Sequence, residues 1–130
     1  MRDIKFRAWD KIHNKMLIVM TLSRREQTPF CLCRDEIRNM SLAMPSIDLE
    51  FMQFTGLKDK NGTDIYEGDI VSRHEIKYTV EWDNGDVRFI GRGISQEGIF
   101  TIHCWGEKQE VIGNIYENPE LLKKEYQGKP

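Results

Sequence analysis

The chain of 130 residues has the length of one domain with a substantial core. Hydrophobic residues make up 39% of it and charged residues 31%, as is typical of a soluble globular protein. The net charge of −2 argues against non-specific binding of nucleic acid, because such binders carry an overall basic excess.

The charge is unevenly distributed along the chain. Residues 1–25 have a net charge of +5, and residues 26–70 have a net charge of −5. These segments could dock within the chain or between copies, although solvated surfaces are the simpler explanation. There is no apolar run of signal-peptide or membrane-span length, and the three cysteines are an odd number. We therefore expect reduced thiols, a cytosolic protein and no membrane association.

Residues 1–22 are predicted to form an N-terminal β-hairpin. In "IKFRAWD" the apolar residues Ile4, Phe6 and Ala8 alternate with other residues, as in a half-buried strand. The apolar run "MLIVM" supplies the second strand, and the turn is expected around His13-Asn14.

Residues 23–65 are predicted to be an irregular middle segment and loop. Pro29 and Pro45 bracket a region in which Ile37, Met40 and Met44 have helical spacing. One short helix or an irregular excursion is therefore expected there. Alternation returns in "DLEFMQFTGL".

Residues 66–130 are predicted to form a barrel-like sheet and a C-terminal helix. The strands "EIKYTVEW" and "DVRFI" flank "DNG", in which Asn84-Gly85 favours the positive φ angles of a tight hairpin turn. "IFTIHCW" and "QEVIGNIYE" are two further strands, and "NPELLKKEY" has the start signals of a short helix. The chain as a whole is expected to be one mostly β domain, in which about residues 66–117 form a small, partly open barrel.

The stretch "FTGLKDKNGTDIYEGDIV", from Phe54 to Val71, contains three evenly spaced glycines. It lacks the Gly-Lys-Ser/Thr ending and the following helix of a phosphate-binding loop, and its acidic residues do not have the spacing of an EF-hand. We therefore predict a structural turn, with exposed charges at Lys58-Asp59-Lys60. The turn motif comprises Gly56, Asn61, Gly62, Gly68 and Asp69.

No catalytic residue, metal site or cofactor is predicted. The candidate zinc or nucleophile set is Cys31, Cys33, His74, His103 and Cys104. The adjacent His103 and Cys104 would point to opposite faces of a strand, so only one of them could join Cys31 and Cys33. Nothing in the sequence orients a histidine as a base for a cysteine.

One aromatic and basic group could stack on bases or bind a peptide. It consists of Arg73, Tyr78, Trp82 and Arg88. In a small barrel such residues are more often core and rim than a binding surface.

Four blocks of the sequence closely resemble the YopX family of bacteriophage and prophage proteins. They are "IKFRAWDKIHNKM", "FTGLKDKNGTDIYEGDIV", "VEWDNG" and "EVIGNIYENPELL", in the order of the family. The resemblance implies a β-rich phage protein in the cytoplasm of the bacterial host. It transfers no functional residue, because the family has no established activity. "YEGDIV" also resembles the entry to a strand of an SH3-like barrel, which is an analogy of fold alone.

These observations favour a non-enzymatic phage accessory protein that binds an unknown phage or host protein, or self-associates into a homo-oligomer. The alternative is a nucleic-acid-binding module that uses the barrel face around Tyr78 and Trp82. An enzyme is the third possibility, and it would require a pocket with perturbed titratable groups.

Overall fold

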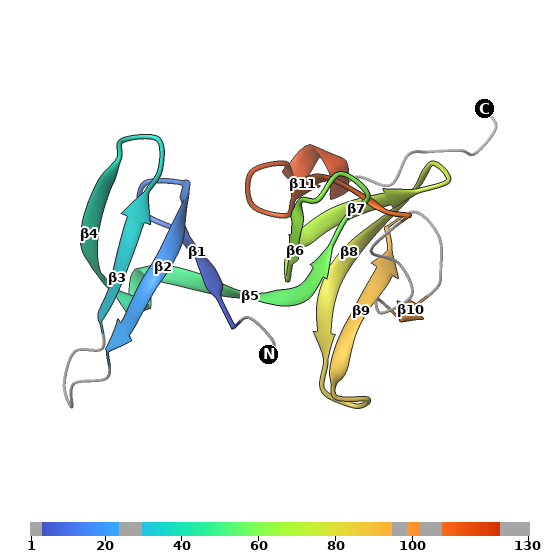
Figure 1. The fold of residues 1–130 in the computed structure, drawn as a ribbon, viewed down its shortest axis with the longest axis horizontal. Coiled ribbons are helices and arrows are strands. Elements are labelled where there is room, and N and C mark those ends of the chain that lie inside the picture. Colours follow the sequence, from blue (N-terminus) through green and yellow to red (C-terminus); the bar gives the residue numbers. More distant parts are fainter. Residues whose placement is uncertain (1–3, 24–29, 95–98, 102–107, 123–130) are drawn as a thin grey trace. The chain divides into compact units, whose positions relative to one another are not determined.

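The computed structural model describes residues 4–23, 30–94, 99–101 and 108–122. The chain divides into two compact units, Met1–Phe54 (unit 1) and Thr55–Pro130 (unit 2). The predicted mostly β class is confirmed, because antiparallel strands make up most of the structure and helical turns are short (Figure 1). Within the described ranges, no helix has the length and apolar character needed to span a bilayer.

Unit 1 is built from four complete strands and the first part of a fifth, in the order β4-β3-β2-β1-β5. The elements are β1 (Phe6–Asp10), β2 (Lys15–Ser23), β3 (Phe30–Asp35), β4 (Met40–Pro45), the 3-10 helix η1 (Ser46–Asp48) and β5 (Leu49–Lys58). The predicted N-terminal hairpin is confirmed, since β1 pairs with β2 from Arg7↔Ile18 to Asp10↔Lys15. Asn14 in its turn has a φ of 53°.

The expected helix or irregular excursion between Pro29 and Pro45 was wrong. The segment is a second hairpin, in which β3 pairs with β4 from Phe30↔Pro45 to Asp35↔Met40. Cys31 and Cys33 alternate inward and are fully buried, which is the period of a strand. Ile37 supported the helical spacing, but it lies in the turn and is 93% exposed.

The core of unit 1 lies on one face of these strands. Its fully or nearly fully buried members are Ala8, Leu17, Cys31, Cys33 and Leu49. Val19, Met44 and Phe51 are half-buried against this cluster.

Unit 2 contains a five-stranded antiparallel sheet in the order β10-β9-β8-β7-β11. Its elements are β6 (Asp64–Tyr66), β7 (Asp69–Arg73), β8 (Ile76–Asp83), β9 (Arg88–Gly93), β10 (Ile99–Thr101), β11 (Glu110–Asn114) and the 3-10 helix η3 (Pro119–Leu122). The strands are not closed into a barrel, and the likeness to an SH3-like fold stays a prediction. The core consists of Ile65, Val71, Tyr78, Val80 and Phe89.

The predicted hairpin around "DNG" is present, but the expected turn geometry was wrong. Asp83↔Arg88 is the last strand pair, so four residues form the loop rather than two. The described positive φ angle in this loop belongs to Val87, at 54°. The Asp83 carboxylate accepts the backbone N–H of Gly85 at 3.2 Å and so stabilises the alternative turn.

The predicted C-terminal helix starts at the expected proline, but within the described range it is a 3-10 turn over Pro119–Leu122. His103 and Cys104 lie outside the described residues.

Candidate functional site

The predicted aromatic and basic group does not form one surface. Tyr78 is 6% exposed and packs within the core of unit 2. Arg73 pairs with Ile76 at the opposite end of β8 from Trp82. At about 3.4 Å per residue, the six residues between Ile76 and Trp82 separate these positions by roughly 20 Å.

Trp82 and Arg88 lie near the β8–β9 turn, but on opposite faces of the sheet. Cross-strand partners share a face, and Trp82 pairs with Phe89 whereas Arg88 pairs with Asp83. The Trp82 ring packs edge-on against Phe89, with 5.0 Å between the ring centroids, and its Nε1 donates to Asn84. A base could stack on Trp82 only without help from Arg88.

A pocket of about 360 Å³ lies in unit 2. It is lined by Gly68, Thr79, Val80, Glu81, Arg92, Gly93, Ile94, Ile115 and Leu122. Glu81 and Arg92 are its titratable lining residues, and Nε of Arg92 donates to Oε2 of Glu81 at 2.9 Å. The Glu81 carboxylate raises the pKa of Arg92, so both groups remain charged and paired. This arrangement supplies no free base or nucleophile, although its volume lies within the range of small-molecule sites.

The predicted turn motif is organised by Asp59, which sequence reasoning placed among exposed charges. That expectation was wrong, because Asp59 is 6% exposed. Its Oδ1 accepts the backbone N–H groups of Asn61 (2.8 Å) and Thr63 (2.9 Å), and its Oδ2 accepts the N–H of Val111 (2.9 Å). Burial alone raises the pKa of Asp59, but these three hydrogen bonds outweigh it, and the net pKa lies below the usual value.

The rest of the motif sets backbone directions. Gly56, Gly62 and Gly68 have φ angles of 89°, 80° and 87°, which strongly favour glycine. The N–H of Gly68 donates to Val80, and its carbonyl accepts from Ile115. Asp69 is 1% exposed and accepts the N–H of Tyr66 at 2.8 Å. These contacts account for the motif without a ligand.

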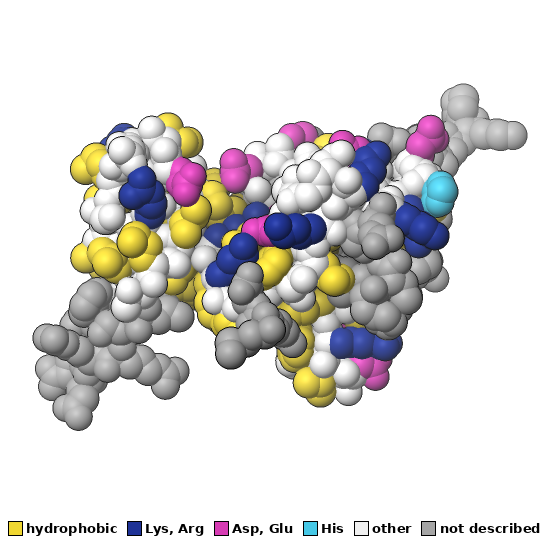
Figure 2. Space-filling view, viewed as in Figure 1, with side chains coloured by type: hydrophobic (Ala, Val, Ile, Leu, Met, Phe, Trp, Pro, Cys, Tyr) yellow, Lys and Arg dark blue, Asp and Glu magenta, His cyan; other side chains and the backbone are white. Residues whose placement is uncertain are grey.

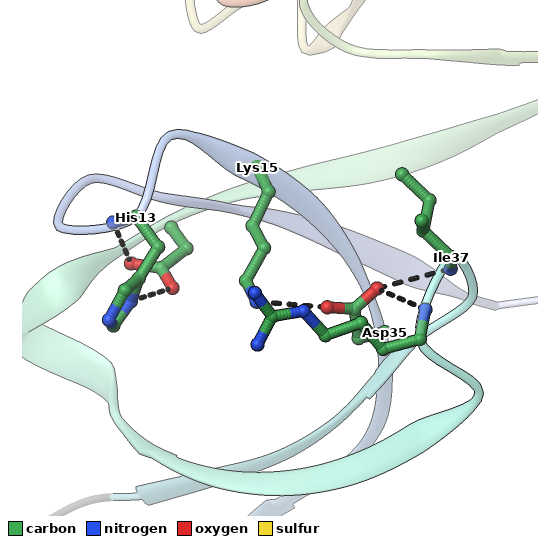
Figure 3. A network of polar contacts seen from close by, with 6 residues as sticks. His13, Lys15, Asp35 and Ile37 are labelled. Carbon is green, nitrogen blue, oxygen red and sulfur yellow. Dashed lines mark hydrogen bonds and ion pairs between the residues drawn. The ribbon is translucent and has the colours of Figure 1, made fainter.

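Two further buried carboxylates hold the turns of unit 1. Asp10 accepts the backbone N–H groups of Ile12 and His13, and its Oδ2 lies 2.7 Å from Nδ1 of His13. Lys15 donates to Asp35 at 2.9 Å, and the same carboxylate accepts the N–H of Ile37 (Figure 3). Lys15 therefore links the β1–β2 hairpin to the β3–β4 turn.

Cys31 and Cys33 are the described part of the candidate zinc or nucleophile set in unit 1. Their sulfur atoms lie 3.2 Å apart, and both residues are fully buried. Burial raises the pKa of both thiols, and that of Cys33 to about 12, so they are protonated and unreactive at neutral pH. His74 lies in unit 2, and the described residues contain no cluster of potential ligands suited to a metal ion.

Sequence reasoning missed the exposed apolar side chains of unit 1. Of the ten large hydrophobic residues that are exposed in the described ranges, seven belong to unit 1: Ile4, Ile12, Ile18, Met20, Ile37, Met40 and Ile47. Figure 2 shows hydrophobic side chains at the surface of the part of the molecule that holds β2 to β4. The missed signal was the unbroken apolar run "MLIVM", because a strand with one wet face normally alternates.

The comparisons with known proteins agree with this two-unit β structure. A search of curated proteins found no match. The chain is similar to the crystal structure of protein EF1440 from Enterococcus faecalis, with 28% sequence identity and a TM-score of 0.63. The match covers 95% of this chain and 100% of that one. The family model described as "YopX protein" matches residues 5–123, nearly the whole chain, and the protein therefore belongs to the YopX family.

Proposed function

We propose that the protein is a non-enzymatic accessory protein of a phage that acts in the host cytoplasm by binding a protein partner or by self-association. The observation that carries this proposal is the concentration of exposed apolar side chains in unit 1. Exposed apolar residues that gather on one part of a soluble protein often mark an interaction surface.

Two structural elements of unit 1 present these side chains. Ile18 and Met20 lie on β2, where they are 42% and 53% exposed. The Ser41 hydroxyl of β4 lies 3.8 Å from the Met20 sulfur, so this apolar surface continues from β2 to β4. Met40 on β4 is 49% exposed.

The perturbed titratable groups also support a binding role over chemistry. The carboxylates with lowered pKa values are Asp10, Asp35 and Asp59, and each accepts backbone N–H groups in a turn. The thiols with raised pKa values are packed in the core of unit 1. Each of these shifts thus has a structural cause.

A binding test should compare the wild type with one variant in each unit. Ile18→Glu places a carboxylate between the cross-strand neighbours Arg7 and Arg34, so the sheet tolerates it while the surface loses its apolar character. Val87→Glu is the matched control, since Val87 is 70% exposed in unit 2. The tagged proteins would be purified from phage-infected cells with and without nuclease, and recovered proteins would be quantified by mass spectrometry.

We expect a nuclease-resistant partner that the wild type and Val87→Glu retain and Ile18→Glu loses. Equal recovery by all three proteins, or no recovery at all, would contradict the proposal. Loss of the recovered material on nuclease treatment would instead favour the nucleic-acid alternative, which also requires affinity that falls steeply with added salt.

A further inference from the structure

Strand β4 ends one sheet and has an open edge. Among the described residues it pairs with β3 alone, and the sheet order starts at β4 (Figure 1). Its sequence, Met-Ser-Leu-Ala-Met-Pro, carries no charge. Natural proteins usually protect such an edge with lysine, an inward-pointing charge or a bulge, because its unpaired backbone groups are a template for another strand. Here only the terminal Pro45 limits pairing.

The side chains of this edge are symmetric about Leu42. Met40 and Met44 lie two residues on either side of it, and the small residues Ser41 and Ala43 lie one residue on either side. The symmetry extends beyond the strand. Ile37 and Ile47, which are 93% and 81% exposed, lie five residues before and five residues after Leu42.

We propose that β4 pairs antiparallel with β4 of a second copy of the chain, around a two-fold axis at Leu42. This inference rests on the proposed function and names the partner. In an isologous antiparallel pair, a residue before the axis faces the residue at the same distance after it in the other copy. Leu42 then faces Leu42, each Met40 faces a Met44, and each Ser41 faces an Ala43.

This register matches both faces of the sheet. On β3 the partners of Met40, Leu42 and Met44 are Asp35, Cys33 and Cys31, whose side chains point inward. The three apolar side chains of β4 therefore share the core face, and two of them are only half-buried where the sheet stops. A second β4 continues that face with apolar groups, while the small residues stack on the other face. No charged residue of the strand faces another.

One strand pair makes a small interface, so we expect a reversible dimer with a Kd of roughly micromolar size. Hydrogen bonding between two edges would give the affinity, and the side-chain symmetry would select a second copy over an unrelated peptide.

The register can be tested at the exposed positions 41 and 43 with two double variants of the full chain. Ser41→Lys with Ala43→Lys places lysine opposite lysine twice in the dimer. Ser41→Lys with Ala43→Glu places lysine opposite glutamate twice, at the same positions and with side chains of similar length. Both put the same lysine beside Arg34 on β3, so effects on the monomer are matched. The self-association constant would be measured by sedimentation over a range of protein concentrations, and thermal unfolding would show that both variants fold.

We expect the wild type and the Lys/Glu variant to dimerise, and the Lys/Lys variant to bind at least about tenfold more weakly than the Lys/Glu variant. A wild type that stays monomeric, or two double variants of equal affinity, would overturn the β4 pairing. If such a monomer still retains a nuclease-resistant partner that Ile18→Glu loses, the proposed function holds and this inference alone fails.

Discussion

Asp10, Asp35 and Asp59 share a structural role that their charge conceals in the sequence. Each is at most 6% exposed and accepts at least two backbone N–H groups in a turn. A carboxylate satisfies such donors better than a neutral group, because a charge-assisted hydrogen bond is about twice as strong. These side chains close loops between strands, so their burial is compatible with a stable fold.

Asp59→Asn should lower the free energy of unfolding by about 1–3 kcal/mol. The amide keeps one oxygen for the N–H groups of Asn61 and Thr63, but its NH₂ group faces the N–H of Val111 and leaves that donor without an acceptor. Urea unfolding would measure the change. Asp86→Asn is the control, because its ion pair with Arg88 is exposed and the change should stay within about 0.5 kcal/mol. Equal effects would show that Asp59 does not hold the loop.

The same aspartates predict acid sensitivity. In Asp35 the hydrogen bond from Lys15 is the main cause of the lowered pKa; in Asp10 burial raises the pKa, but the hydrogen bonds from His13 and Ile12 outweigh it. A carboxyl whose pKa is lower in the folded state than in the unfolded state, at about 3.9, binds more protons when unfolded. Its stabilisation is therefore complete above about pH 5 and is lost as the pH falls through the folded pKa.

We therefore expect the urea midpoint to change little from about pH 7 to 5 and to fall steeply below about pH 4. Asp59→Asn should make that fall shallower, because one of the contributing groups is gone. A midpoint that stays constant down to about pH 3 would show that these carboxyls have ordinary pKa values in the folded protein.

At the scale of elements, sequence patterns predicted strands well and their connections poorly. Alternation identified β1 and β8, because each has one buried face. It failed at β3–β4, where the spacing of Ile37, Met40 and Met44 fits a helix and a hairpin equally well when the burial of Cys31 and Cys33 is unknown. The turn at Asp59 was also missed, because its partner Val111 is 52 residues away in the sequence. Such a contact depends on tertiary structure.

The β8–β9 turn offers a test of one such connection. Val87 has a φ of 54° and is 70% exposed, an unfavourable backbone conformation for a β-branched residue. Val87→Asn should raise the free energy of unfolding by about 1 kcal/mol, because asparagine tolerates this conformation and little packing is lost. Thermal unfolding would measure it.

Gly85→Ala is the paired control for this turn. Gly85 does not have a positive φ, and an added Cβ would meet only the Asp83 carboxylate at 3.4 Å. Its effect should stay within about 0.5 kcal/mol. A loss of 1 kcal/mol or more on Gly85→Ala would instead support the two-residue turn that Asn84-Gly85 suggested, since alanine is strained at a positive φ by about that amount.

At the scale of the whole molecule, the chain has two cores, one in each unit, and strand β5 contributes to both. Leu49 and Phe51 belong to the core of unit 1, and Leu57 packs against the core of unit 2. The length of 130 residues predicts one domain, and composition cannot show how apolar residues divide between clusters. Whether the two units unfold together is therefore an experimental question.

The pairing of β5 predicts that unit 1 withstands the unfolding of unit 2. Unit 1 uses β5 from Leu49↔Asp10 to Gln53↔Phe6, and the N–H of Phe54 donates to Lys5, so its ladder needs nothing beyond the boundary at Phe54. Val80→Ala should destabilise unit 2 by about 2 kcal/mol. The buried thiols Cys31 and Cys33 report on unit 1, because they become reactive only when its core opens.

Thiol labelling under native conditions, in a Cys104→Ser background, separates the two possibilities. Val80→Ala should change the labelling rate of Cys31 and Cys33 by less than about twofold, since the opening of unit 1 does not involve the core of unit 2. Leu17→Ala, in the core of unit 1, should raise that rate by about 30-fold or more. If Val80→Ala accelerates labelling as much as Leu17→Ala does, a lost contact in one core is felt in the other, and the two units form a single cooperative domain joined through β5.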